Sequence, residues 1–318
     1  MLVLAACDVE SSVATNIPPS RSEDISGPIQ PLPARVETNA KKVRLGQRLF
    51  FDKRLSRDGS VACASCHSLD HYGVDNRRVA VGIDGHLGNV NAPTVLNSGF
   101  NFRQFWDGRA ASLEEQVGGP VTNPAEMGAR WAEVIPRLQG DGEINALSLD
   151  AFGVPINEDV VRSALAEYER SLVTPDAPFD RYLRGDANAL SAEAREGWRL
   201  FRQIGCASCH QGINIGGNMY ATLGVMGNYF EGRAIEPSDL GLFNRTGREQ
   251  DRYKFKVPSL RNVAETAPYF HDGRIDTLED AVDVMARTQL GLRLRTEDRQ
   301  HLVAFLKSLT GKLAEPAP

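Results

Sequence analysis

Apolar side chains recur every three to four residues in several separate stretches of the chain, which is the spacing of one face of an α-helix. Within residues 159–173, for example, Val161 and Leu165 share such a face. Pro175 follows this stretch and marks a stop. Segments in which apolar and polar residues alternate, as in strands, are few. The pattern therefore predicts a mainly α-helical protein.

Residues with short polar side chains stand where several of these helices would begin. Ser112 and Glu115 form a capping box, in which two side chains satisfy free backbone N–H groups of the first turn. Ser191, Thr277 and Thr296 are the expected N-caps of three later helices. A further helix is expected from about residue 41.

Two long segments, residues 67–111 and 211–270, are rich in Gly and Asn and predict loops. Long loops in a compact domain usually have a function or wrap around something. Residues 8–38 are rich in Ser, Pro and Asn without a sustained apolar period, and they predict a flexible tether.

Composition narrows the class of protein. The length of 318 residues suggests two domains, and 42% hydrophobic with 24% charged residues is ordinary for a globular chain. The net charge of -5 includes no basic excess, so nucleic-acid binding is not expected. No apolar run reaches about 18 residues, so no transmembrane helix is expected.

Four of the five cysteines belong to two identical pentapeptides, residues 63–67 and 206–210, with the sequence Cys-Ala-Ser-Cys-His. This is the attachment signature of a c-type haem. Two thiols add across the two vinyl groups of one porphyrin, and the histidine that follows binds the iron. We therefore expect two covalently bound haems, one on Cys63, Cys66 and His67 and the other on Cys206, Cys209 and His210.

Other interpretations of the cysteine pairs are weaker. A thioredoxin-like redox site does not require the histidine that follows both pairs. A zinc site with four cysteine ligands would need the pairs much closer than the about 140 residues that separate them. Because bacteria attach haem outside the cytoplasm, we expect a periplasmic protein.

The fifth cysteine, Cys7, ends the sequence Leu-Ala-Ala-Cys, which resembles the lipobox of a bacterial lipoprotein. The charged n-region and the full apolar h-region of a signal peptide do not precede it. We expect a lipid anchor at Cys7, with residues 1–40 as signal remnant and tether. An inert thiol in a leader is the alternative.

The two haem motifs lie 143 residues apart and form a weak internal repeat. We therefore expect a mainly α fold of two cytochrome c-like domains, each built around one haem. The N-terminal haem domain would cover residues 41–174 and the C-terminal haem domain residues 175–318.

Eight further fragments occur in a fixed order between the motifs and after them. They are NAPTVLN (91–97), FWDGR (105–109), LEEQ (113–116), GP (119–120), NPAEMG (123–128), KVPSLRN (256–262), TAPYFHDG (266–273) and VMAR (284–287). With the haem motifs, this ordered set resembles the bacterial di-haem cytochrome c peroxidases over about residues 40–312.

The resemblance implies an enzyme that reduces hydrogen peroxide to water. In that family the N-terminal haem reacts with peroxide, and the C-terminal haem receives electrons from a small cytochrome c or a cupredoxin. His67 would then be the proximal ligand of the peroxidatic haem and His210 that of the electron-transfer haem. Members of the family often form homodimers.

The resemblance also implies the ligands on the far side of each iron. Met285 stands where the electron-transfer haem takes a methionine, which raises the potential of an iron. A core methionine on the same helical face as Leu278 is the alternative, and Met219 and Met226 stay open as competitors.

His86 resembles the ligand that occupies the peroxidatic iron at rest and leaves before peroxide binds. Its neighbour Gly85 suits a loop that moves. The alternative is a permanently open haem. His71, four residues after His67, is the rival ligand, and we expect it at the surface.

Glu126 matches the glutamate of the family's distal pocket, and Gln116 and Pro120 match further residues of that pocket. Cleavage of peroxide needs a group that moves a proton from the near to the far oxygen, and a positioned carboxylate can do this. Without the resemblance, Glu126 would be interpreted as an acidic residue in the first turn of a helix, where the helix dipole favours it.

Trp106 matches a tryptophan that lies between the two haems, an expected electron relay, although a buried tryptophan can also be plain core. Trp131 and Trp198 are expected in the core. Arg261 and His271 are expected beside haem propionates.

Asn91, Thr266 and Pro268 match a calcium site between the domains. Oxygen donors suit this hard cation. Thr266 and Pro268 would bind through backbone carbonyls, so their side chains say little about the chemistry.

Two rival functions stay open. Di-haem enzymes that mature methylamine dehydrogenase, and so oxidise a protein substrate, resemble this chain but carry a tyrosine where Met285 stands. A non-catalytic electron-transfer cytochrome is the other rival, and Glu126 argues against it.

Overall fold

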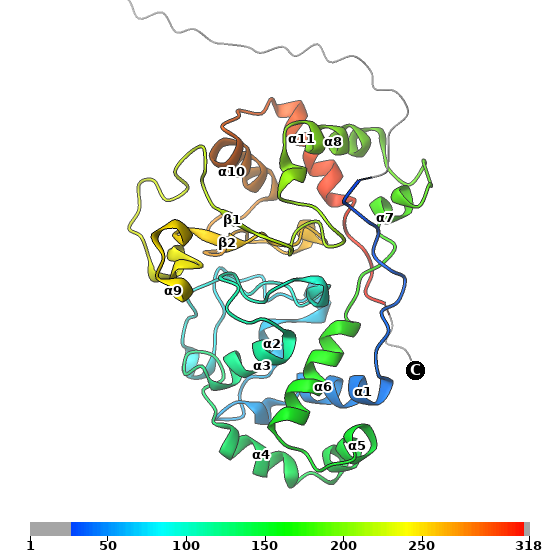
Figure 1. The fold of residues 1–318 in the computed structure, drawn as a ribbon, viewed down its shortest axis with the longest axis vertical. Coiled ribbons are helices and arrows are strands. Elements are labelled where there is room, and N and C mark those ends of the chain that lie inside the picture. Colours follow the sequence, from blue (N-terminus) through cyan, green and yellow to red (C-terminus); the bar gives the residue numbers. More distant parts are fainter. Residues whose placement is uncertain (1–26, 315–318) are drawn as a thin grey trace, which may run out of the picture.

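The computed structural model describes residues 27–314, so Cys7 and the predicted anchor lie outside the described residues. The chain is mainly helical, as predicted, and forms two parts stacked along its longest axis (Figure 1). Within the described residues, no helix is long and apolar enough to cross a membrane.

The α-helices are α1 Ala40–Phe50, α2 Cys63–Cys66, α3 Leu113–Thr122, α4 Trp131–Gln139, α5 Gly142–Phe152, α6 Glu158–Ser171, α7 Pro178–Leu183, α8 Ala192–Gln203, α9 Phe243–Thr246, α10 Leu278–Leu290 and α11 Thr296–Lys307. The strands are β1 Tyr220–Thr222 and β2 Lys254–Lys256, which pair antiparallel with Tyr220 opposite Lys256. The remaining turns include eight short 3₁₀ helices, η1 Lys53–Leu55, η2 Leu69–His71, η3 Ile83–Gly85, η4 Ser98–Phe100, η5 Cys206–Ser208, η6 Pro237–Leu240, η7 Glu249–Asp251 and η8 Val263–Glu265. Residues 67–111 and 211–270 are mostly loop, as predicted.

Three of the predicted N-caps are confirmed. Ser112, Ser191 and Thr277 each accept a backbone N–H from three residues later, at 3.1 Å, and so begin α3, α8 and α10. The prediction for Thr296 was wrong, because Thr296 is the first residue of α11 and Arg295 holds the cap position. Arg295 pairs with Asp298 at 2.7 Å and closes this helix start without a side-chain cap.

Helices α4 and α5 were not predicted. Trp131, Val134 and Leu138 follow the helical spacing, but Pro136 interrupts the pattern inside α4. Asp141 accepts the backbone N–H groups of Glu143 and Ile144 and so begins α5.

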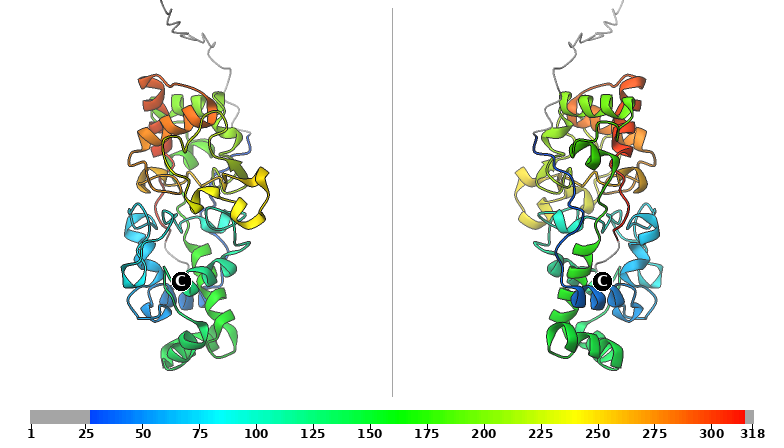
Figure 2. Two further views of the ribbon diagram at one scale, coloured as in Figure 1. Left: turned by 90° about the vertical axis from the view of Figure 1, so that its left-hand side faces the viewer. Right: turned by 90° about the vertical axis from the view of Figure 1, so that its right-hand side faces the viewer.

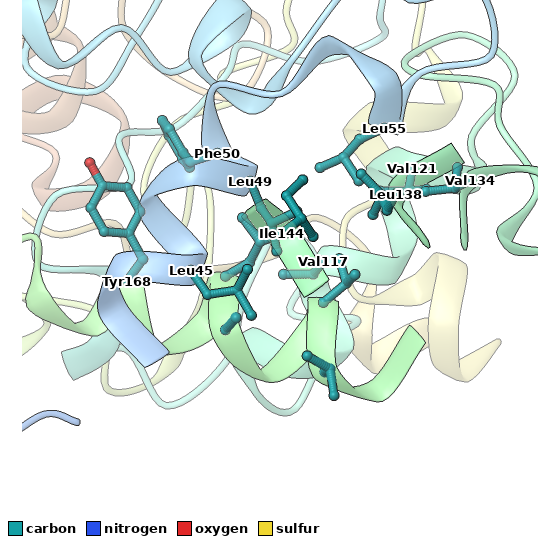
Figure 3. Packing of buried hydrophobic residues seen from close by; sticks show 14 of the residues in the cluster. Leu45, Leu49, Phe50, Leu55, Val117, Val121, Val134, Leu138, Ile144 and Tyr168 are labelled. Carbon is teal, nitrogen blue, oxygen red and sulfur yellow. The ribbon is translucent and has the colours of Figure 1, made fainter. Parts of the chain in front are cut away.

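The core of the N-terminal part lies where α1 crosses α6 (Figure 3). Leu45 and Leu49 of α1 are fully buried there. Gly46 lies at the crossing, where a Cβ atom would come within 2.0 Å of the carbonyl oxygen of Ala164. The two backbones are in contact, which only glycine permits.

The C-terminal part repeats this arrangement with α8 and α11. Gly197 lies at the crossing, and a Cβ atom there would come within 1.9 Å of the carbonyl oxygen of His301. Trp198 is buried beside Phe305 in this core, as expected, and Trp131 packs against the core of the other part. In both parts, the helix that precedes the haem motif crosses a helix near the end of the part.

A second internal repeat, which the sequence analysis missed, has a spacing of 165 residues. The sequence Phe-x-Asp-Gly-Arg occurs at 105–109 and again at 270–274. Phe105 and Phe270, which begin the two copies, both have a positive φ, of 69° and 67°. The N-caps Ser112 and Thr277 are also 165 residues apart, so α3 and α10 are equivalent helices.

Hydrogen bonds across the junction are reciprocal in this repeat. The backbone N–H of Asn91 donates to the carbonyl oxygen of His271 at 2.8 Å. The equivalent N–H of Lys256 donates to the carbonyl oxygen of Trp106 at 2.9 Å. Such a reciprocal pattern is that of two copies related by an approximate two-fold axis. The rings of Trp106 and His271 meet edge to face, with centroids 6.4 Å apart.

Residues 27–39 do not form the flexible tether that the sequence predicted up to residue 40. Ile29 and Leu32 are buried in the C-terminal part, and the N–H of Leu32 donates to Asp180 at 3.0 Å. From there the segment runs along the molecule to α1 (Figure 2). The sequence did not reveal this packing, because two buried apolar residues in a proline-containing stretch are too few to produce a helical or strand period.

Candidate active site

The first Cys-x-x-Cys-His motif forms helix α2, with His67 directly after it. The Nδ1–H of His67 donates to the carbonyl oxygen of Gly73 at 3.1 Å, which fixes the ring and leaves Nε2 as the free lone pair. Burial lowers the pKa of His67. The imidazole is therefore held neutral, the form that binds a metal.

A short hairpin carries His86 next to this motif. The carbonyl oxygen of Val81 lies 4.0 Å from Sγ of Cys66, and the N–H of Gly82 donates to the carbonyl of His86 at 2.8 Å. The Nδ1–H of His86 donates to the carbonyl of Ile83 at 3.1 Å, so its Nε2 is also free. His86 is exposed on this hairpin.

Glu126 lies against the same hairpin. Its carbonyl oxygen accepts the N–H of Ile83 at 2.8 Å, and a Cβ atom on Gly82 would come within 2.5 Å of it. The first motif, the His86 hairpin and Glu126 are thus brought together, although 59 residues separate Glu126 from His67.

The Glu126 carboxyl group is oriented by Asn123, whose Nδ2 donates to Oε1 at 2.7 Å. Among residues 27–314, no hydrogen bond reaches Oε2. Burial raises the pKa of Glu126, and the Asn123 bond and the charge of Arg109 oppose this in part. A partly buried carboxyl with one free oxygen can take up and release a proton.

Helix α3 supports the glutamate. The carbonyl oxygen of Pro120 accepts the N–H of Met127 at 3.1 Å, and Gln116 is partly buried one turn earlier on α3. The guanidinium of Arg109 stacks on Phe105, 3.4 Å from the ring centroid, and Phe105 packs against Gly119. The sequence analysis assigned no role to Asn123 or Arg109, although both lie in the fragments that carry the resemblance.

The second motif opens into a mostly apolar cavity of about 280 Å³. Cys206, Cys209 and His210 line one wall, and Met285 of α10 lines the cavity as well. Burial lowers the pKa of His210 to about 4, so this imidazole is also neutral.

The rival methionines are placed differently. Met226 is 64% exposed and packs against Gly291, and neither Met226 nor Met219 is among the residues that line the cavity. His71, the rival histidine, is exposed, as expected.

The cavity fits a haem. Its wall is apolar, two thiols and a neutral imidazole stand together on it, and a thioether is available from another helix. At the first motif, burial likewise raises the pKa of Cys63 to about 12 and that of Cys66 to about 11, so both are neutral thiols in apolar surroundings.

Trp106 lies at the junction of the two parts and lines the cavity. Its Nε1–H donates to the carbonyl oxygen of Asn91 at 2.9 Å, and its own carbonyl accepts from Lys256. The indole is therefore tied to Asn91 of the N-terminal part, and the backbone of Trp106 is tied to Lys256 of the C-terminal part.

Asn91, Thr266 and Pro268 line the same cavity. The Nδ2 of Asn91 donates to the carbonyl of Arg77 at 2.9 Å. Within the described part of the chain, no donor reaches its Oδ1. A buried amide oxygen beside two backbone segments is compatible with a hard cation.

The expectations for His271 and Arg261 have different outcomes. His271 lines the cavity, and its Nε2 lies 2.7 Å from Oδ1 of the buried Asp239. Arg261 is not among the residues that line the cavity, and its expected place beside a haem propionate stays a prediction. It is fully buried and bonds to Asp180 at 2.6 Å, and this carboxylate neutralises its charge.

Comparisons with known proteins agree with this geometry. Residues 40–188 match the family model described as di-haem cytochrome c peroxidase. The chain is 47% identical over 285 residues to cytochrome c peroxidase Ccp of Escherichia coli, covering 89% of this chain and 61% of that protein. It is 43% identical over 285 residues to cytochrome c551 peroxidase of Nitrosomonas europaea, covering 89% of this chain and 84% of that protein. The methylamine utilization protein MauG of Methylorubrum extorquens is more distant, at 37% over 300 residues, covering 90% of this chain and 82% of that protein.

A solved structure supports the fold. The crystal structure of a MauG-like protein associated with microbial copper homeostasis superposes with a TM-score of 0.80. The identity is 28%, and the match covers 96% of each chain.

Proposed function

The chain belongs to the di-haem cytochrome c peroxidase family, and from this premise we propose that it reduces hydrogen peroxide to water with electrons from a small redox protein. As a member of this family, the chain carries two c-type haems. The observation that carries the proposal is the arrangement of Glu126 beside the first haem motif, with a partly buried carboxyl group and one free oxygen.

Six residues would hold the two haems. Cys63 and Cys66 would bind the first through thioethers with His67 as iron ligand, and Cys206, Cys209 and His210 would do the same for the second. When bound, the haems supply iron that exchanges single electrons and a site at which the peroxide bond is cleaved.

Glu126 would transfer the proton of the peroxide. Its ionised Oε2 accepts the proton of the peroxide oxygen nearer the iron and returns it to the far oxygen, which leaves as water. Asn123 holds Oε1, so the free oxygen keeps one direction. Gln116 and Pro120 would complete the walls of this pocket and orient the peroxide.

His86 would close the pocket at rest. Its Nε2 is free, and it stands on a hairpin in which Gly85 has a φ of 74° and open space around it. This hairpin can move without breaking packed contacts at Gly85. We propose that His86 would bind the iron of the first haem at rest, and that its movement away in the half-reduced protein would open the site to peroxide.

Electrons would enter at the C-terminal haem, with His210 and Met285 as iron ligands, and pass by way of Trp106. Trp106 suits this role because its indole N–H bonds to Asn91 in the N-terminal part and its backbone carbonyl bonds to Lys256 in the C-terminal part. A calcium ion bound by Asn91, Thr266 and Pro268 would fix the junction at the same place.

The donor would be a small cytochrome c or a cupredoxin in the periplasm. The chain spans 61% of the length of its E. coli relative, so activity, substrate and partner are all part of this proposal. A lipid anchor at Cys7 and a homodimer belong to it as well.

The test is peroxide-dependent oxidation of a reduced small cytochrome c by the half-reduced, calcium-loaded holoprotein. Glu126→Gln keeps the Asn123 contact geometry but cannot accept a proton, so we expect turnover to fall by about 100-fold or more. Glu133→Gln removes a carboxylate of similar size from α4 and is the matched control, with turnover near that of the wild type.

Equal turnover in Glu126→Gln and the wild type would contradict the assigned role. If the wild type oxidises no small donor yet consumes peroxide in the presence of a protein substrate, the maturation-type oxidase replaces the peroxidase.

A further inference from the structure

Lys256 is a buried cation without an ion-pair partner in the described part of the chain. It ends strand β2, is 6% exposed and lines the cavity that contains His210 and Met285. No carboxylate of residues 27–314 lies within 4.0 Å of its Nζ, and no hydrogen bond from it is formed. Lys254, two residues earlier, pairs instead with Asp251 at 3.1 Å.

An isolated buried ammonium is unfavourable, so proteins pair such groups. Burial alone lowers the pKa of Lys256 to about 8, and no neighbouring carboxylate opposes this. The buried acids Asp239 and Asp272 are already bound by Arg233 at 2.6 and 3.1 Å, and the buried Asp251 is bound by Lys254 at 3.1 Å. The compensating charge must therefore come from whatever fills the cavity.

The backbone holds Lys256 in place. Its N–H donates to the carbonyl of Trp106 at 2.9 Å, and it pairs with Tyr220 in the sheet. The backbone position of Lys256 at the cavity wall is therefore fixed by the sheet and by the junction.

The internal repeat gives an independent argument. Lys256 is the counterpart of Asn91 at the 165-residue spacing, and both residues are 6% exposed. Their N–H groups make the equivalent hydrogen bonds across the junction. The N-terminal part thus presents an amide oxygen that could hold a cation where the C-terminal part presents an ammonium group.

We propose that Lys256 is a built-in counter-charge for a carboxylate of the haem on Cys206, Cys209 and His210, and that it keeps the reduction potential of this haem high. The inference rests on the proposed function only in placing a haem here. Reduction adds one electron from the donor and therefore one negative charge to the haem. A cation buried nearby stabilises the reduced form, because electrostatic interactions are strong in a medium of low dielectric constant.

The test is a redox titration of the holoprotein followed by the absorbance of each haem. Lys256→Met removes the charge with similar side-chain length, and we expect a lower potential of the C-terminal haem with little change at the N-terminal haem. Lys256→Arg should restore the potential. Lys254→Met removes one positive charge from the same strand outside the cavity and should leave both potentials unchanged.

A potential in Lys256→Met equal to that of Lys254→Met would overturn the proposal. If Lys256→Met fails to take up the second haem, Lys256→Gln and Lys256→Arg show whether the charge or the packing of the lysine is needed. Loss of haem in the neutral variants alone supports a required charge, whereas equal loss in Lys256→Arg means that the lysine is needed only for packing. None of these readouts depends on peroxide turnover, so the proposal can fail while the peroxidase function holds.

Discussion

At the scale of single residues, the chemistry depends on which atom of each side chain is left free. In His67 and His86, a backbone carbonyl accepts a hydrogen bond from the Nδ1–H, so Nε2 is free in both rings. In Glu126, Asn123 occupies Oε1 and leaves Oε2. These partners orient the two rings and the carboxyl group for the roles proposed for them as iron ligands and as base.

The raised pKa of Glu126 predicts the acid limb of the pH profile. Glu126 acts as a base in its ionised form, so kcat/KM for peroxide falls as the pH drops through its pKa. Because burial raises this pKa above the ordinary value of 4.5, the limb lies above that pH. The profile of kcat/KM between about pH 4 and pH 8 measures it. A limb at or below 4.5, or one that persists in Glu126→Gln, would contradict the assignment.

Single residues differ in how far the sequence could predict them. The haem-binding residues could be predicted because thioether chemistry demands a local spacing. Asn123, Arg109 and Lys256 could not be assigned roles, because their partners come from other segments or from the cavity. The partner of Arg261 could not be predicted for the same reason, since Asp180 lies 81 residues away in the sequence.

At the scale of elements, α3 and α10 are equivalent helices that carry different chemistry. Each begins at a capping hydroxyl, Ser112 or Thr277, and Pro120 stands eight residues after the first as Met285 stands eight after the second. Proline has no atom that can bind iron. The repeat thus offers a physical reason why one haem would take a fixed methionine ligand and the other would keep a site for His86 or peroxide.

Pro120→Met should convert the peroxidatic haem toward an electron-transfer haem. The new thioether would compete with peroxide for the iron, so we expect a higher potential of the N-terminal haem and at least a tenfold loss of peroxide turnover. Absorbance spectra and a redox titration of the holoprotein measure the change. Pro136→Met is the matched control, because Pro136 also lies within a helix, α4, and is exposed.

Unchanged spectra and turnover in Pro120→Met would show that position 120 does not face the iron. A loss of turnover without any change in the spectrum or potential would mean a packing defect instead.

Helices with strong local sequence signals could be predicted, and elements with weak signals could not. Caps and helical spacing identified α1, α3, α6, α8, α10 and α11, because these signals lie within one or two turns. Helix α4 was missed because Pro136 lies within it. The pairing of β1 with β2 inside the long loops left no local pattern in the sequence. The Phe-x-Asp-Gly-Arg copies were visible in the sequence, and comparison of the two would have revealed the repeat.

At the scale of the whole molecule, buried amides join the two parts. Asn97 and Asn262, equivalent in the repeat, both bond to Oγ1 of Thr174, at 2.8 and 2.9 Å. Residues 27–39 and the chain after α11 also cross between the parts, the latter with a bond from Ala314 to Val173 at 2.9 Å. The distance and orientation of the two haem motifs are therefore set by many contacts, which local sequence patterns cannot reveal.

Removal of calcium should weaken electron transfer across this junction. Asn91→Ala deletes the free amide oxygen but keeps the backbone bond to His271, so we expect calcium affinity to fall at least tenfold and turnover to fall with it. Calorimetric titration with calcium and donor oxidation before and after chelation measure both effects. Asn76→Ala, which removes a bond to the carbonyl of Ala267 at the same junction, is the control.

Equal calcium binding by Asn91→Ala and the wild type would exclude Asn91 as a ligand. Full turnover of the chelated wild type would show that the junction needs no cation.

The central claim is that this chain passes electrons from a small redox protein to peroxide. The most direct measurement is the number of reduced cytochrome c molecules oxidised for each peroxide consumed by the holoprotein. Because reduction of one peroxide to two waters takes two electrons, the account predicts two donors per peroxide, with no oxidation when peroxide is left out. Peroxide consumption without oxidation of the cytochrome, or oxidation that does not depend on peroxide, would contradict it.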